Sequence, residues 1–208
     1  MPWIFTIICA VAVAATLYYE YRRPPLHRYP KMVASTGFIA VALSVGALDT
    51  TFGKIILIGL ALSWFGDFFL ALPGRGPFVA GLAVFLAGHI AYVLAFTNRG
   101  LGDDIYLPIA AVAVVALAIG RWLMPTVPQE LKAPVVVYIT VISAMVALAV
   151  STNAFEADWR IPVGAVAFYL SDLGVARDRF AAPGFINRIL GLPLYYGGQL
   201  LLAWAAGG

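Results

Sequence analysis

The chain has 208 residues, of which 62% are hydrophobic and 11% are charged, and its formal net charge is +3. A soluble globular domain carries about 25% charged residues, so this composition excludes a surface that faces mostly water. It indicates a polytopic membrane protein surrounded largely by lipid. No linker, charged tail or region of different composition interrupts the sequence, and we expect a single membrane domain over residues 1–208.

Eight apolar runs approach the length of about 20 residues that a membrane-spanning helix needs. In chain order they are 2–19, 31–48, 52–72, 77–97, 105–122, 131–151, 161–176 and 189–206. Proline, glycine and arginine break the pattern, as at Arg22-Arg23-Pro24-Pro25 and at Pro73-Gly74. The sequence therefore predicts an all-α integral membrane protein, a bundle of about eight transmembrane helices.

The basic residues predict an orientation. Only Lys54, Arg99 and Arg160 follow the second, fourth and sixth runs. The other loops hold Arg22, Arg23, Arg28, Lys31, Arg75, Arg121, Lys132, Arg177, Arg179 and Arg188. By the positive-inside rule, these other loops face the cytoplasm and both termini lie on the non-cytoplasmic side, in a bacterial inner membrane. No basic residue precedes the first run, which favours a span over a signal peptide.

Two acidic residues lie inside apolar runs: Asp67 in the third and Asp172 in the seventh. An unpaired carboxylate in hydrocarbon costs about 3 kcal/mol, so we interpret both as functional. The alternative is a hydrogen-bonded pair that only holds helices together. The remaining acidic residues lie in loops or at run ends, where we expect contact with water.

The two acids are predicted to lie at the same depth. Asp67 comes five residues before Leu72 and Asp172 five residues before Arg177, which is about 7–8 Å along a helix. The two runs cross in the same direction, so the carboxyls can share one site near the inner leaflet. Apart from Lys54 at the far end of the third run, neither run contains Lys or Arg. We therefore expect at least one carboxyl to be neutral, which gives an acid and base pair.

Small and polar side chains accompany each acid. Glycines share its helix face and allow a neighbouring helix or a ligand to approach closely. Candidates for orienting a substrate are Ser63, His89, Tyr92, Ser171, Asn187, Tyr195, Tyr196 and Gln199. The alternative roles are helix packing for the histidine and interface anchoring for the tyrosines.

Four arginines on the side of the two acids are candidates for binding a lipid phosphate or head group. They are Arg75, Arg177, Arg179 and Arg188, and plain topology-setting charge explains them equally well. The basic residues form no patch interleaved with aromatic residues, so we expect no nucleic-acid partner.

Metal and cofactor chemistry find no support in the sequence. With His27 and His89 as its two histidines, the chain cannot build a zinc site of three histidines. It also lacks a serine nucleophile elbow, a phosphate-cradling loop and a dinucleotide fingerprint. We expect no metal and no cofactor, and we interpret Cys9 as a small apolar residue.

Two ordered blocks carry a resemblance to a known family. The first is Ser63-Trp64-Phe65-Gly66-Asp67-Phe68-Phe69-Leu70, followed by Phe78, Gly81, Phe85, His89, Tyr92 and Phe96. The second runs from Gly164 to Asp172 and continues with Arg179-Phe180, Tyr195-Tyr196 and Gln199-Leu200. The sequence resembles the YhhN-like lysoplasmalogenase family of membrane alkenyl-ether hydrolases.

That resemblance implies an eight-span fold and hydrolysis of the vinyl ether bond of lysoplasmalogens. The products would be a fatty aldehyde and a glycerophospho-ethanolamine or -choline, and Asp67 and Asp172 would be the catalytic pair. Two alternatives stay open. One is a proton-coupled carrier of a small lipid or solute, which paired acids on similar helices also suit. The other is a membrane scaffold without catalysis.

Overall fold

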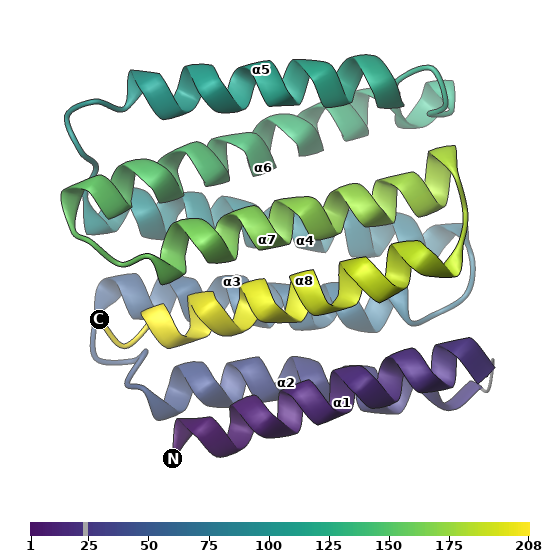
Figure 1. Cartoon of the computed structure of the whole chain (residues 1–208), viewed down its shortest axis with the longest axis horizontal. Coiled ribbons are helices and arrows are strands. Elements are labelled where there is room, and N and C mark those ends of the chain that lie inside the picture. Colours follow the sequence, from purple (N-terminus) through teal and green to yellow (C-terminus); the bar gives the residue numbers. More distant parts are fainter. Residues whose placement is uncertain (23–24) are drawn as a thin grey trace.

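The computed structural model describes residues 1–22 and 25–208 (Figure 1). Arg23 and Pro24, which the sequence places in the first loop, lie outside the described residues. Within the described ranges the chain is helical and has no strand. The eight α-helices are α1 (Pro2–Arg22), α2 (Arg28–Ser44), α3 (Thr51–Leu70), α4 (Arg75–Arg99), α5 (Tyr106–Leu123), α6 (Gln129–Phe155), α7 (Arg160–Ala176) and α8 (Phe185–Ala205).

Two short helical turns complete the described chain. A 3-10 turn at Pro25–His27 leads into α2, and a π-helical turn at Arg177–Ala181 extends the end of α7. Local sequence also sets where helices begin. The Thr50 side chain accepts a hydrogen bond from the Gly53 backbone at 2.9 Å and so caps α3. Gly74 adopts a φ of 112°, which only glycine tolerates well, at the turn into α4.

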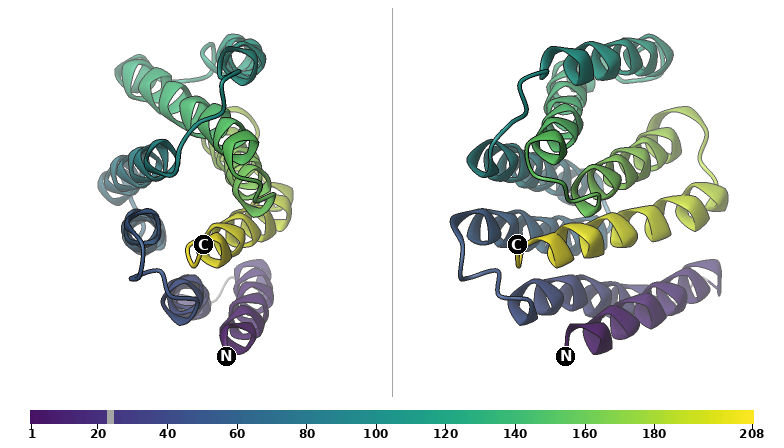
Figure 2. Two further views of the ribbon diagram at one scale, coloured as in Figure 1. Left: turned by 90° about the vertical axis from the view of Figure 1, so that its left-hand side faces the viewer. Right: turned by 60° about the vertical axis from the view of Figure 1, so that its left-hand side comes forward.

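Seven helices pack in a ring, and α5 lies outside the ring against α6 (Figure 2). The order around the ring is α1, α2, α3, α4, α6, α7 and α8, which returns to α1. Helix α8 also contacts α2 and α3 across the ring. Side chains of α2, α3 and α8 therefore meet in the interior of the bundle, around Asp67 of α3.

Successive helices run in opposite directions, so both termini lie at the same end of the bundle (Figure 1). The connections from α1 to α2, α3 to α4, α5 to α6 and α7 to α8 lie at the other end. These connections include the loops in which the sequence concentrates its basic residues. Which end faces the cytoplasm stays a prediction.

Five of the described helices, α1, α3, α4, α5 and α6, are long and apolar enough to cross a membrane. Helices α2 and α7 have 17 residues each, and α8 carries Asn187, Arg188 and Gln199 within its 21 residues. The prediction of an all-helical integral membrane protein is confirmed at this level. The crossing of all eight helices stays a prediction.

Two glycine contacts bring the site helices close together. A Cβ at Gly66 of α3 would lie 2.6 Å from the Phe85 ring of α4, so the ring packs where only glycine leaves room. A Cβ at Gly198 of α8 would lie 2.7 Å from the carbonyl oxygen of Gly164 in α7. Helix pairs α3–α4 and α7–α8 therefore pack through small residues, as the sequence predicts for the runs that carry the two acids.

Candidate functional site

A cavity of about 350 Å³ lies at the end of the bundle opposite the termini, and Asp67 and Asp172 both line it. One part of its wall is apolar and comes from α4, α5 and α6, with Leu82, Ile119 and Ile139. Another part is polar and comes from the ends of α1, α2, α7 and α8. The cavity thus joins the two acids with an apolar wall and with charged groups.

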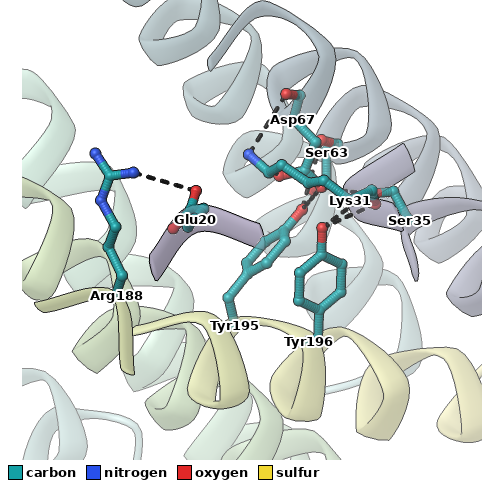
Figure 3. A network of polar contacts seen from close by, with 8 residues as sticks. All are labelled: Glu20, Lys31, Ser35, Ser63, Asp67, Arg188, Tyr195 and Tyr196. Atoms are coloured by element: carbon teal, nitrogen blue, oxygen red, sulfur yellow. Dashed lines mark hydrogen bonds and ion pairs between the residues drawn. The ribbon is translucent and has the colours of Figure 1, made fainter. Parts of the chain in front are cut away.

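Asp67 is buried and fully engaged by neighbouring groups (Figure 3). Its Oδ1 lies 3.1 Å from the Lys31 Nζ of α2. Its Oδ2 accepts hydrogen bonds from the Ser35 hydroxyl at 2.7 Å and the Tyr195 hydroxyl at 2.6 Å. Three elements, α2, α3 and α8, therefore converge on one carboxyl group.

A second layer of hydrogen bonds holds these partners in place. The Tyr196 hydroxyl lies 3.1 Å from the Ser35 hydroxyl and donates to the Lys31 carbonyl oxygen at 3.1 Å (Figure 3). The Lys31 Nζ also approaches the backbone carbonyl oxygen of Asp67 at 3.4 Å. The carboxylate orientation is thus fixed by side chains that are themselves bonded.

The ion pair corrects one expectation from the sequence. The sequence places Lys31 among the loop charges and shows no Lys or Arg near Asp67 within its own run. Lys31 instead lies in the first turn of α2 and is buried against Asp67. The signal was present, since Lys31 is directly followed by an apolar run, but only the packing of α2 on α3 pairs the two residues.

Asp172 has a different environment. The Tyr138 hydroxyl of α6 donates to its Oδ2 at 2.6 Å, and the His89 Nε2 of α4 lies 3.5 Å from the same oxygen. The side chain is 17% exposed, compared with 2% for Asp67. In the described part of the chain, Asp172 forms no ion pair with Lys or Arg.

The imidazole beside Asp172 is oriented by the backbone. The His89 Nδ1 lies 2.7 Å from the Phe85 carbonyl oxygen, a contact that requires a proton on Nδ1. In the neutral ring, Nε2 then carries the lone pair, and it lies 3.5 Å from Asp172 Oδ2. Nε2 is buried and has no hydrogen-bond partner among the described residues. The approach of His89 Nε2 to Asp172 Oδ2 is favourable when one proton resides on either Asp172 or His89.

The sequence candidates separate into two groups. Those that line the cavity with the two acids are Ser171, Arg179, Asn187, Arg188 and Tyr195. The other candidates apart from arginines are buried outside its lining, namely Ser63, His89, Tyr92, Tyr196 and Gln199. Within this second group, the Tyr92 hydroxyl donates to Gln199 Oε1 at 2.6 Å, which ties α4 to α8.

The four arginine candidates are also divided. Arg75 pairs with the exposed Glu130 at 2.8 Å and does not line the cavity. Arg177 donates to Asn187 Oδ1 and likewise lies outside the lining. Arg179 and Arg188 do line it: Arg179 lies over the Phe78 ring at 4.3 Å.

Sequence reasoning missed several residues around the cavity. Direct partners of the two acids also include Ser35, Tyr138 and Lys31, which come from α2 and α6, the helices that carry neither block of the resemblance. Tyr138 could have been noticed as a tyrosine inside an apolar run. Glu20 was expected to contact water, but its side chain is only 10% exposed and lines the cavity.

The structure also corrects the expectation that Asp158 contacts water. Asp158 is buried and paired with Arg160 at 2.8 Å, near the end of the bundle that holds the termini.

No group of three or more His, Cys, Asp or Glu side chains in residues 1–22 and 25–208 is arranged to hold a metal ion.

Comparison with known proteins identifies relatives of the chain. The family model described as the YhhN family matches residues 26–206. The lysoplasmalogenase TMEM86A of Bos taurus is 32% identical over 157 residues, and that of Homo sapiens is 33% identical over 157 residues. Both matches cover 73% of this chain and 64% of the relative. A lysoplasmalogenase of Mycobacterium bovis is 30% identical over 171 residues, which are 76% of this chain and 62% of the relative.

The matched region thus spans less than two thirds of the length of these relatives. No solved structure matches the chain.

Proposed function

The chain belongs to the YhhN family, and from this membership and the cavity we propose that it is a membrane-embedded hydrolase of the vinyl ether bond in lysoplasmalogen-type lysophospholipids. The observation that carries the proposal is a pair of carboxyl groups in one cavity with contrasting surroundings. Asp67 forms an ion pair with Lys31, whereas Asp172 has no Lys or Arg partner among the described residues. Relatives at 30–33% identity are named lysoplasmalogenases, which supports the substrate class.

The reaction needs a proton and a water molecule. Protonation of the alkene carbon distant from the ether oxygen converts the vinyl ether into an oxocarbenium ion. Water adds to this cation and loses a proton, and the resulting hemiacetal collapses to a fatty aldehyde and the free glycerol hydroxyl. One water is consumed: the donated proton stays on carbon in the aldehyde, and a proton released by the water passes through the acid pair to restore the acid. The step therefore requires one neutral acid and one carboxylate near the developing cation.

We assign the proton donor to Asp172. The contact with the bare Nε2 of His89 is favourable only when the two groups hold a proton between them. The Tyr138 hydroxyl fixes the orientation of the carboxyl. Asp172 is also the more exposed of the two acids, so a substrate in the cavity can reach it. Two carboxyls with contrasting surroundings divide acid and base roles in glycosidases in the same way.

We assign Asp67 to the charged partner. Lys31, Ser35 and Tyr195 all stabilise its carboxylate form, which can then stabilise the oxocarbenium ion and accept a proton from the attacking water. The apolar wall from α4 to α6 would hold the alkenyl chain. Of the four arginine candidates, Arg179 and Arg188 are placed to bind the phosphate, because both line the cavity.

The proposal includes the membrane arrangement. All eight helices cross a bacterial inner membrane, both termini lie on the non-cytoplasmic side, and the cavity lies near the inner leaflet. The excess of basic residues in the loops at the cavity end supports this orientation.

Substrate consumption by the purified protein in detergent tests the function. We expect aldehyde release from a 1-alkenyl lysophospholipid and none from its 1-acyl or saturated 1-alkyl counterparts, since only the vinyl ether forms an oxocarbenium ion on protonation. A carrier would leave all three lipids unchanged in detergent. No aldehyde from any 1-alkenyl lysolipid, with the protein folded, would therefore overturn the proposal.

Isotope labelling tests which bond breaks. In water enriched in oxygen-18, we expect the glycerol product to keep the original ether oxygen and to contain no label. Label in the glycerol hydroxyl would show attack on the glycerol carbon and would contradict the oxocarbenium route.

A further inference from the structure

Building on the proposed function, we infer that Glu20 and Arg188 form a subsite for a zwitterionic head group, in which the Glu20 carboxylate binds the head-group ammonium and Arg188 binds the phosphate. The inference makes Glu20 a determinant of substrate specificity. Glu20 lies in the last turns of α1, before the residues that the family model matches, so the family match assigns it no role.

The contacts of the two Glu20 carboxylate oxygens support this assignment. Its Oε1 lies 3.2 Å from the Arg188 Nη1, and Figure 3 shows this pair beside the Asp67 network. Its second oxygen, Oε2, is buried and has no hydrogen-bond partner among the described residues. A buried carboxylate oxygen without a donor is unfavourable. A ligand that brings a cation with N–H or N–CH groups into the cavity would satisfy it.

The charges around Glu20 favour a zwitterion over a simple anion. Arg188 also lies 3.8 Å from Asp178, so two carboxylates already surround this one guanidinium. A phosphate alone would approach Arg188 together with these negative charges. A head group with an ammonium beyond its phosphate supplies a positive charge for Glu20 while the phosphate meets the guanidinium, which has five N–H donors to share.

The position of the subsite agrees with the order of groups in a lysophospholipid. Glu20, Arg188 and the two catalytic candidates line the same cavity, with the charged pair contributed by α1 and α8. In the substrate, the vinyl ether, the glycerol, the phosphate and the amine follow one another along one chain. A lipid with its vinyl ether at the acids therefore extends its head group toward the polar part of the wall.

The test compares head groups on wild type and Glu20→Gln. The probes are 1-alkenyl lysolipids bearing ethanolamine phosphate, N-acetylated ethanolamine phosphate or phosphate alone. We expect Glu20→Gln to raise KM for the ethanolamine lipid about ten- to hundredfold, the range for a hydrogen bond to a charged group, with kcat little changed. KM for the two lipids without an ammonium should stay the same or fall.

Glu130→Gln is the matched control, because it removes an exposed carboxylate that pairs with Arg75 at the same end of the bundle. It should leave the head-group preference unchanged. An equal rise in KM for all three lipids in Glu20→Gln would show that Glu20 only positions Arg188, and it would overturn the inference.

Binding of non-cleavable 1-alkyl lysolipids separates this inference from the proposed function. Wild type should bind the ethanolamine lipid more tightly than its N-acetylated form, whether or not any vinyl ether is hydrolysed. Equal binding of the two by wild type would contradict the subsite even if hydrolysis is observed and even if Glu20→Gln does not fold. Preferential binding without hydrolysis would keep the subsite and remove the hydrolase.

Discussion

At the scale of single residues, the two acids differ in what they contact rather than in their type. Asp67 meets a lysine ammonium and two hydroxyl donors, whereas Asp172 meets a tyrosine hydroxyl and an imidazole nitrogen. The first set stabilises a negative charge, and the second is compatible with a retained proton. The same residue type can therefore serve as a charged stabiliser and as an acid within one cavity.

Removing the cation beside Asp67 should show what the ion pair contributes. In Lys31→Met the buried carboxylate loses its partner, and we expect a loss of about 3–5 kcal/mol in unfolding free energy together with lower activity. The double variant Lys31→Met/Asp67→Asn should recover much of the stability but not the activity. Thermal unfolding in detergent measures the first effect, and equal melting temperatures for the single variant and wild type would contradict it.

The sequence identified both acids because a carboxyl group within an apolar run is exceptional. Its candidates included Tyr195 and His89 but not Lys31, Ser35 and Tyr138, which lie 32 or more residues from the acids along the chain, in runs that carry neither acid. Their roles depend on how α2 and α6 pack against α3 and α7. Glu20 was missed for a related reason: a charged residue at a helix end is normally in water, and only the fold buries it.

At the scale of helices, close packing sets the geometry of the cavity. Helix α8 approaches α7 at Gly198 and Gly164 and contributes Tyr195 to Asp67 on the neighbouring turn. Helix α3 approaches α4 at Gly66, which packs against the Phe85 ring. The backbone carbonyl of Phe85 in turn orients His89. The helix runs and their small residues were predictable from the sequence. The ring order and the outside position of α5 were not, because those depend on contacts between distant runs.

Two adjacent glycines of α8 provide a test of this packing. A Cβ at Gly198 would overlap the Gly164 carbonyl oxygen, a backbone atom that cannot rotate away, whereas a Cβ at Gly197 would meet no atom within 4 Å. We expect Gly198→Ala to lose about 1–3 kcal/mol in unfolding free energy and to lower activity. Gly197→Ala should be neutral or stabilising by up to about 1 kcal/mol. Similar melting temperatures for the two variants would contradict the close approach of α7 and α8.

At the scale of the whole molecule, both termini lie at one end of the bundle, and the cavity with its charged groups lies at the other. Composition and hydropathy were sufficient to predict the helical membrane class. Helices α2 and α7 have 17 residues each, which is the short end of the range for a membrane span, so their crossing of the membrane stays a prediction.

Cysteine labelling in sealed spheroplasts tests the orientation. In a background in which the single cysteine is replaced by Cys9→Ala, Asp103→Cys lies at the termini end and Gly76→Cys at the cavity end, both at exposed positions. We expect an impermeant thiol reagent to label Asp103→Cys in sealed spheroplasts and Gly76→Cys only after lysis. The reverse pattern would invert the orientation, and labelling of both in sealed spheroplasts would contradict the eight-span arrangement.

We propose that Asp172 donates the proton to the alkene carbon and that Asp67 acts as the charged partner. The most direct test is the rate of aldehyde release from a 1-alkenyl lysophospholipid by wild type, Asp172→Asn and Asp67→Asn, each purified in detergent with its fold verified by thermal unfolding. We predict that Asp172→Asn loses about 10²–10⁴-fold in kcat, as expected for a missing general acid, and that Asp67→Asn loses about 10²–10³-fold, as expected for a missing electrostatic stabiliser. Wild-type rates from a folded Asp172→Asn protein would contradict the account.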